Sequence, residues 1–187
     1  MTIRDEKIIK AAGAVFLRYG FKRATMNDIA QEAAISRQTL YNSFANKDEV
    51  LRGAIRKTID ETLAAIEADC AKAASLEEAL ESLFQHMVIK PYEFLTSSPH
   101  AEEFLEGLSG PGRSEVVSRE KDYRALIEKI LEPEKDALIA KGLAPDRVAE
   151  LIYVAGKATK NGTTSRQHLK TRVETLKLMI LDLTAAT

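Results

Sequence analysis

The stretch from Thr25 to Lys47, TMNDIAQEAAISRQTLYNSFANK, constrains the fold of this chain more than any other part of the sequence. Side chains that commonly cap helix N-termini occur three times within it, twice with an acidic residue three positions later. These caps are Thr25 with Asp28, Ser36, and Asn46 with Glu49. Three helix starts in so few residues predict two short helices joined by a tight turn at Ala34 and Ile35, followed by the start of a third helix.

Each of the two short helices is predicted to have an apolar face. The residues on these faces are Met26, Ile29, Ala30 and Ala33 in the first helix, and Leu40 and Phe44 behind Ser36. The outward residues of the second helix are Arg37, Gln38, Tyr41 and Asn42. They place a guanidinium, two amides and a phenol near a helix N-terminus, which suits the major groove of DNA. The alternative is a solvated face on a small helical hairpin; the turn spacing, the outward tyrosine and the local positive charge favour DNA.

This stretch resembles the DNA-binding region of the TetR family of transcriptional regulators. The residues that match the family pattern are Thr25, Ile29, Ala30, Ala33, Ser36, Thr39, Leu40, Tyr41, Phe44 and Lys47. The resemblance is strong for residues 1–55 and is architectural beyond them. The sequence departs from the pattern at three positions. Ala34 stands where the turn usually has Gly, so the turn lacks the residue that adopts a positive φ easily. Gln38 replaces a common Gly and can add a base contact, and Asp48 precedes the acidic Glu49.

The resemblance implies a homodimeric, ligand-responsive regulator, with repression as its expected action, that binds an inverted repeat in double-stranded DNA. We expect three residues to contact base edges, namely Arg37, Gln38 and Asn42. We expect five others to contact phosphates, namely Thr25, Ser36, Thr39, Tyr41 and Lys47. Two alternatives remain open at this stage. The chain could act as an activator, or the helix-turn-helix could belong to a helical module that binds protein instead of DNA.

The composition predicts an all-α fold. Nine Gly and five Pro are too few for a loop-rich β protein, and strand-like alternation is scarce. The net charge of −1 is unevenly distributed, because residues 1–47 carry eight basic and four acidic residues and the remainder carries 19 and 24. A basic head on an acidic body suits phosphate binding at one end. We therefore expect two domains, a three-helix helix-turn-helix head at residues 1–47 and a helical bundle for ligand binding and dimerisation at residues 48–187.

Caps and breakers divide the chain outside this stretch into further helices. Gly20 should end the first helix, Pro91 should end the helix that Ser75 caps, and Pro133 should break a longer one. An irregular or single-turn piece is expected at residues 92–95, a helix from Ser98 to Leu108, and a flexible loop at residues 109–112. The other helices are expected at about residues 4–19, 47–73, 114–141, 145–160 and from 165 onwards.

The body is the expected place for an inducer, as in the family, and for dimerisation. The candidate pocket residues are mostly aromatic or large and apolar, with one polar handle, and are Phe84, His86, Met87, Tyr92, Phe94, Phe104, Tyr123, Ile127 and Tyr153. The alternative for each is an ordinary core position. The last helix is apolar almost all round, so a second subunit is the simplest cover for one side. The expected interface residues are Leu151, Ala155, Leu176, Ile180 and Leu183.

We find no catalytic or metal-binding motif in the sequence. There is no Gly-rich nucleotide loop and no Gly-x-Ser-x-Gly, and His86, His100 and His168 form no ligand pattern. We therefore expect no enzyme activity, no cofactor and no metal. Cys70 is in register with apolar residues and is expected in the core. Neither a signal peptide nor a membrane-spanning segment is visible, so we expect a cytoplasmic protein.

Overall fold

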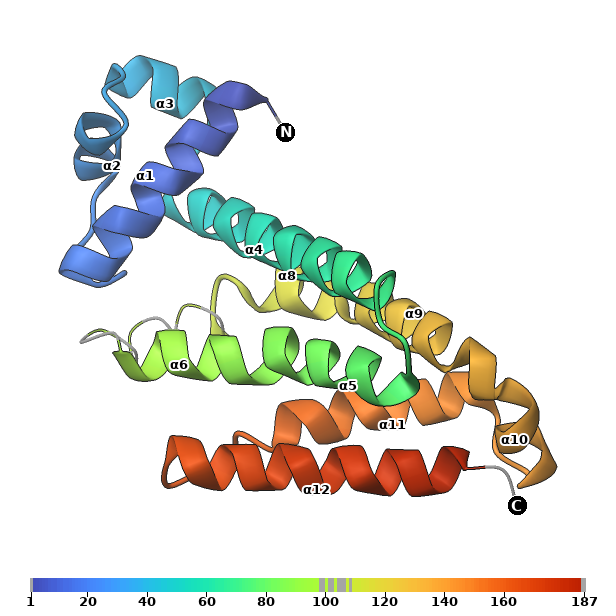
Figure 1. Cartoon of the computed structure of the whole chain (residues 1–187). Helices are drawn as coiled ribbons and strands as arrows, with labels where there is room; N and C mark the ends of the chain where they lie inside the picture. The colour runs from blue at the N-terminus through green and yellow to red at the C-terminus, as the bar shows by residue number, and fades with distance from the viewer. Residues whose placement is uncertain (1, 98–99, 101–102, 104–106, 108, 186–187) are drawn as a thin grey trace. The chain divides into compact units, whose positions relative to one another are not determined.

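A computed structural model describes residues 2–97, 100, 103, 107 and 109–185. Every regular element in these ranges is helical, which confirms the all-α prediction (Figure 1). The chain divides into two compact units, one formed by residues 1–60 and 95–119 and the other by residues 61–94 and 120–187. The sequence-based boundary at residue 47 therefore lies inside the first unit, at the start of a long helix. Within the described ranges, no helix is both long enough and apolar enough to cross a bilayer.

The first unit is built on a three-helix head. Its helices are α1 (Ile3–Tyr19), α2 (Met26–Glu32), α3 (Arg37–Ser43), the first part of α4 (Lys47–Cys70) and α8 (Arg113–Ser118). Fully buried side chains from three of these helices, Ile8, Ile29 and Leu40, meet in one apolar cluster with Leu51 of α4. The short helices α2 and α3 are therefore held by a shared core, because helices of seven residues are not stable alone.

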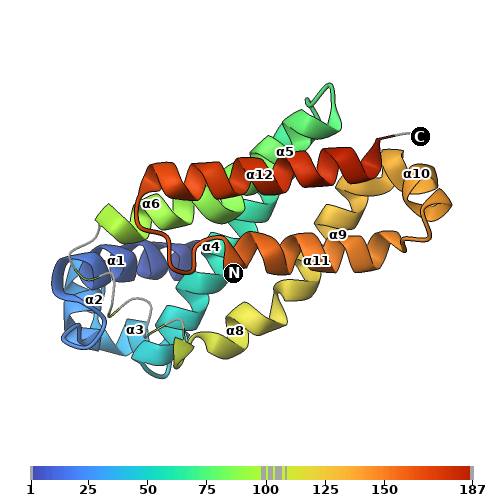
Figure 2. The same ribbon diagram turned by 90° about the horizontal axis from the view of Figure 1, so that it is seen from below.

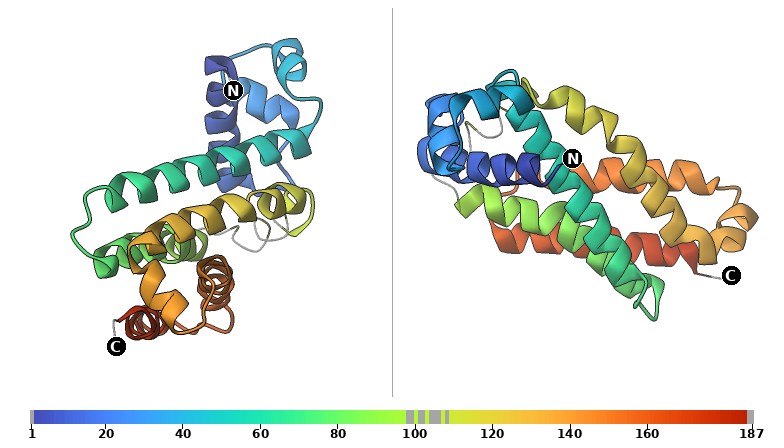
Figure 3. Two further views of the ribbon diagram at one scale, coloured as in Figure 1. Left: turned by 90° about the vertical axis from the view of Figure 1, so that its right-hand side faces the viewer. Right: turned by 90° about the horizontal axis from the view of Figure 1, so that it is seen from above.

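The second unit has its own core, which lies among its long helices. Its elements are the last part of α4, α5 (Leu76–Phe84), a π-helix (Gln85–Ile89), the first part of α6 (Lys90–Ser97), α9 (Glu120–Leu131), a 3₁₀ turn (Glu132–Glu134), α10 (Lys135–Ala140), α11 (Pro145–Ala158) and α12 (Arg166–Thr184). Helix α11 packs against α9 and α12 (Figure 2), and α11 and α12 lie side by side (Figure 3). Phe84, Ile127 and Leu169 are fully buried in this core.

The prediction that Pro91 ends a helix was wrong. The chain stays helical through a π-helix and α6 as far as Ser97, so residues 92–95 are helical as well. The N–H of Lys90 donates to the carbonyl of Gln85, five residues back, which widens the turn at the point where Pro91 enters. Since proline has no N–H and crowds the preceding turn, this wider turn accommodates it without ending the helix.

The other boundaries follow the sequence signals closely. Pro133 falls in the 3₁₀ turn between α9 and α10, and Pro145 begins α11, as expected. The expected helix over residues 114–141 is further divided near Arg119, and α4 ends at Cys70 instead of residue 73. The predicted helix between Ser98 and Leu108 begins and ends outside the described residues.

Cys70 packs against the core of the second unit, in agreement with its predicted position. Its thiol donates to the carbonyl of Ala79 at 3.8 Å. Burial raises the pKa of the Cys70 thiol, and nearby Asp69 adds to the effect. Cys70 is therefore protonated at neutral pH, and its thiol is less reactive than a thiolate.

Candidate nucleic-acid interface

The cap at Thr25 fixes the start of α2. The hydroxyl of Thr25 accepts the N–H of Asp28 at 3.2 Å, and the Asp28 carboxylate accepts the N–H of Thr25 at 2.9 Å. The same carboxylate accepts the Thr25 hydroxyl at 2.7 Å, and these hydrogen bonds lower the pKa of Asp28. The predicted capping box is confirmed. Because the Thr25 hydroxyl is engaged within this box, its direct role is to orient the first turn of α2.

The turn between α2 and α3 adopts a positive φ at a residue that resists it. Ala34 has φ +49°, while Ala33 before it has φ −77° and ψ −5°. The N–H of Ile35 donates back to the carbonyl of Ala30 at 3.0 Å, which closes the turn. The sequence pointed to a turn without an easy positive φ; the structure shows that the turn takes the left-handed conformation with alanine.

Helix α3 presents a polar face outwards and holds Leu40, which is fully buried, inwards. Arg37, Gln38, Tyr41 and Asn42 are all exposed, in agreement with their predicted outward position. The Gln38 side-chain amide donates to the side-chain oxygen of Asn42 at 2.9 Å, one turn further along. The two amides are thereby held as a pair on the surface of the helix.

The N-terminus of α3 is capped as predicted. The Ser36 hydroxyl accepts the N–H of Thr39 at 3.0 Å, and the two hydroxyl oxygens lie 2.8 Å apart. The next cap is also present, because the N–H of Glu49 donates to the side-chain oxygen of Asn46 at 2.9 Å. Both hydroxyls at the start of α3 thus have partners within the helix, and a phosphate would have to share them.

The ammonium group of Lys47, which is predicted to contact phosphate, is directed towards the loop between α1 and α2. This group donates to the carbonyls of Phe21 at 2.7 Å, Ala24 at 2.9 Å and Lys22 at 3.2 Å. It also lies 4.6 Å from the centroid of the Phe21 ring. An ammonium has three protons, so its donors are all used by this loop between α1 and α2.

Two contacts that steady the head were missed by the sequence reasoning. The Arg18 guanidinium pairs with Glu32 at 2.9 Å and ties α1 to the end of α2. The carboxylate of Glu103 accepts the backbone N–H of Lys22 at 3.1 Å, in the same loop that Lys47 binds. The second pair is separated by 81 residues, and no local pattern marks such a contact.

A ladder of polar contacts joins α4 to the α8 region of the first unit. Glu115 is buried and receives both arms of the Arg56 guanidinium, at 2.9 and 2.8 Å. The hydrogen bonds from Arg56 hold the pKa of the Glu115 carboxyl below its ordinary value. One turn before this pair, Arg52 donates to the carbonyl of Pro111 at 3.4 Å. One turn after it, Arg119 pairs with Asp60.

The residues predicted to line a ligand pocket are mostly packed in the core of the second unit. Phe84, Met87, Ile127 and Tyr153 are buried, and Tyr92 and Tyr123 pack against that core. Tyr123 stacks on Tyr153 with ring centroids 5.6 Å apart. Phe94 is 45% exposed, and His86 lies 3.1 Å from Asp69 and 3.3 Å from Lys90. Phe104 lies outside the described residues.

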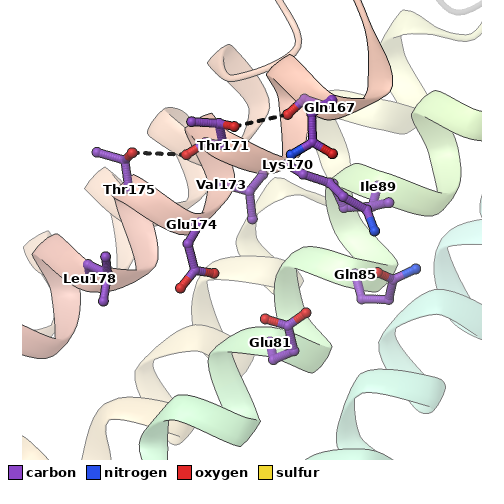
Figure 4. Close-up of a pocket in the computed structure, with 10 residues that line it drawn as sticks. All are labelled: Glu81, Gln85, Ile89, Gln167, Lys170, Thr171, Val173, Glu174, Thr175 and Leu178. Carbon is purple, nitrogen blue, oxygen red and sulfur yellow. Dashed lines mark hydrogen bonds between the residues drawn. The ribbon is translucent and has the colours of Figure 1, made fainter.

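Two hollows of the described surface have other linings. A groove of about 390 Å³ runs between the α5 region and α12, and Figure 4 shows Glu81 and Gln85 on one side of it and Lys170 and Glu174 on the other. A shallower hollow of about 510 Å³ lies along α11 around Leu151. Neither is lined by any of the nine predicted pocket residues, so the inducer site stays a prediction.

The predicted dimer residues have mixed environments. Leu151 is 65% exposed, and Ala155, Leu176 and Leu183 are half-buried. Ile180 is only 4% exposed and packs in the core of its own unit, so it is not available to a partner in this arrangement. The large exposed apolar side chains on these helices are Leu151, Val154, Leu178 and Met179.

The three histidines contact different residues. His100 is 3.7 Å from Glu103, and the ring of His168 contacts the hydroxyl of Thr164 at 3.0 Å. In the part of the chain that the structure describes, no group of three or more His, Cys, Asp or Glu side chains could hold a metal ion.

The fold and the exposed face of α3 define a helix-turn-helix protein with a C-terminal helical domain. Residues 8–54 match the family model described as bacterial regulatory proteins, tetR family. A curated relative, the uncharacterized HTH-type transcriptional regulator YfiR of Bacillus subtilis (strain 168), is 38% identical over 60 residues. The aligned segment covers 32% of this chain and only 29% of that relative.

Solved structures extend the likeness in fold over nearly the whole chain. The fatty acid degradation regulator FadR from Bacillus halodurans is 18% identical, with a TM-score of 0.68. The alignment covers 95% of this chain and 96% of that protein. SmeT of Stenotrophomonas maltophilia, solved as a triclosan complex, is 20% identical, with coverages of 97% and 91% and a TM-score of 0.65. The family match covers residues 8–54, and the solved structures show that the likeness in fold continues beyond this segment.

Proposed function

We propose that this protein is a sequence-specific DNA-binding regulator of transcription that uses α3 as its recognition helix. The observation that carries the proposal is the exposed set of Arg37, Gln38, Tyr41 and Asn42 on a helix whose opposite side is anchored by buried Leu40. Side chains of these types on the exposed face of a short capped helix are those that read the major groove. The basic balance of residues 1–47 adds the attraction to phosphate that such binding requires.

The contacts within α3 suggest which residues would contact bases and which would contact phosphates. Arg37 can donate two N–H groups to the acceptors of guanine. Gln38 uses one amide proton on Asn42 and keeps an acceptor and a second proton, which is the pattern that matches adenine in the major groove. Tyr41 is 42% exposed and is the proposed phosphate contact on this face. The hydroxyls of Thr25, Ser36 and Thr39 support the phosphate contacts from within their caps.

We also propose that the protein acts as a homodimer on an inverted repeat. Support comes from the exposed apolar side chains on α11 and α12, such as Leu151 and Leu178. A charged residue there should oppose burial in a subunit interface. We expect Leu178→Glu to convert dimer to monomer in sedimentation, whereas Ile139→Glu, at an exposed apolar position on α10, should not. Equal behaviour of both variants would contradict this assignment.

The expected action is repression that a small molecule relieves. This part of the proposal rests on likeness, since SmeT is described as the repressor of a multidrug efflux pump and was solved with triclosan. The body of the present chain has the same fold at low identity. Titration of the protein–DNA complex with triclosan, followed by fluorescence anisotropy, is a first test of release. Retention of DNA at saturating triclosan would count against this ligand.

The experiment for DNA binding compares DNA from upstream of the protein's own coding region with a scrambled duplex, at 50 and 200 mM salt. Each pair of cationic phosphate contacts should cost about 10-fold in affinity over this range. We expect Arg37→Ala to weaken binding and relax the base preference, whereas Tyr41→Ala should weaken binding to both duplexes alike. Salt-independent or absent binding would overturn the proposal and favour a protein-interaction module.

A further inference from the structure

Lys47 is the first residue of α4, and its ammonium group is turned towards the protein. Its three hydrogen bonds, at 2.7, 2.9 and 3.2 Å, end on carbonyls of Phe21, Ala24 and Lys22. These carbonyls belong to one short loop between α1 and α2. The ring of Phe21 adds a cation–π contact at 4.6 Å. Four contacts therefore fix the position of a single charged group.

The loop that Lys47 binds leads directly into the helix-turn-helix. Gly20 begins it with φ +79°, and the N–H of Ala24 donates to the carbonyl of Gly20 at 3.1 Å. The next residue is Thr25, the N-cap of α2. Because irregular backbone has no regular ladder of hydrogen bonds, the position of its carbonyls depends on donors such as Lys47. A shift of this loop would shift the cap and hence the first turn of α2.

We propose that Lys47 is a positioning residue that fixes the loop before α2 to the start of α4, and that it does not itself bind phosphate. The second half of the proposal rests on the DNA-binding function proposed above. A phosphate contact would require the ammonium to leave three carbonyls and an aromatic face. One exposed ionic contact, which salt screens, does not compensate for those losses.

Arginine is the variant that separates positioning from phosphate binding. A guanidinium binds phosphate at least as well as an ammonium, so Lys47→Arg would preserve a phosphate contact. Its donors lie in a flat fork, however, and cannot converge on three carbonyls around one point as the protons of an ammonium do. Lys47→Met keeps much of the apolar stem and removes the charge. Lys10→Met, at an exposed lysine on α1, is the matched control for loss of one positive charge from the head.

The first arm of the experiment uses the full chain without DNA. Thermal unfolding and amide hydrogen exchange are measured for wild type, Lys47→Arg, Lys47→Met and Lys10→Met. We expect both Lys47 variants to lower Tm by about 3–6 °C and to raise exchange at the Ala24 amide about 10-fold or more. Lys10→Met should match wild type. Wild-type exchange and Tm in Lys47→Arg would overturn the positioning role.

The second arm measures the salt dependence of binding to the upstream duplex and to its scrambled control. If Lys47 only positions the loop, its variants lose affinity while the slope of log K against log salt stays that of wild type. If Lys47 binds phosphate, Lys47→Met flattens the slope by about 0.9 per subunit, and Lys47→Arg keeps both slope and affinity. A protein that binds neither duplex would contradict the proposed function, while the first arm would still decide the role of Lys47 in the loop.

Discussion

The left-handed alanine in the turn between α2 and α3 leads to a prediction of increased stability. Ala34 has φ +49° and is exposed, so Ala34→Gly removes strain without removing a buried group. The left-handed conformation costs an L-residue about 1–2 kcal/mol. Glycine costs about 0.4–1 kcal/mol more conformational entropy on folding. The difference predicts a gain of roughly 0.5–1 kcal/mol, or about 1–4 °C in Tm for a chain of this size.

The neighbouring residue provides the control for this prediction. Ala33 has φ −77° and is 1% exposed, so Ala33→Gly gains no relief of strain and loses a buried methyl group. We expect it to cost about 1–2 kcal/mol. Urea denaturation of Ala34→Gly, Ala33→Gly and wild type measures both effects. Destabilisation by both variants would show that the turn is not strained at Ala34 and would refute the reasoning.

Two further predictions concern buried charged groups. Arg56 lowers the pKa of Glu115 below 4.5, so this pair contributes stability at neutral pH that is lost as pH falls through the folded-state pKa. Glu115→Gln should cost about 1–2 kcal/mol at pH 7, and the difference from wild type in urea melts should shrink towards pH 3. Burial alone would lower the pKa of Lys177, but hydrogen bonds to Glu174 and Glu81 raise it above 10.5. Its contribution is therefore complete below pH 10.5, and the loss of stability in Lys177→Met should be constant from pH 7 to pH 9 and vanish only at strongly alkaline pH.

The helix caps and outward positions that the sequence predicted correctly depend on short-range geometry. A cap such as Thr25 and its partner Asp28 are three residues apart, and the helical backbone itself brings them together. The outward face of α3 follows in the same way, because the burial of Leu40 fixes the direction in which Arg37 and Tyr41 point. Most helix starts are local properties of this kind, and they could be predicted without a structure.

The position of the Lys47 ammonium group could not be predicted from the sequence, because the atoms that accept its hydrogen bonds belong to the backbone. Every residue has a carbonyl, so the sequence does not mark the three that bind Lys47, which lie more than twenty residues earlier in the chain. A lysine before an acidic first turn of a helix looks like an exposed cation. Its direction is decided by the path of the loop. The same reason explains the packed pocket candidates, since an aromatic residue such as Phe84 looks alike in the sequence whether it lines a cavity or fills a core.

The extent of the first unit shows how such distant contacts alter the picture of the head. Arg52, Arg56 and Asp60 are spaced by four residues on α4, which puts them on one face, and each contacts a residue 59 positions later. The sequence shows the spacing on α4 but not the partner, because the intervening chain has no fixed path until it folds. Glu115 is buried against α4, so removing Arg56 from the folded protein would leave an unpaired buried carboxylate, which is costly. The α8 region is therefore part of the unit that contains the helix-turn-helix, and this unit extends to residue 60 of α4, past the boundary at residue 47 that the charge distribution and helix starts had indicated.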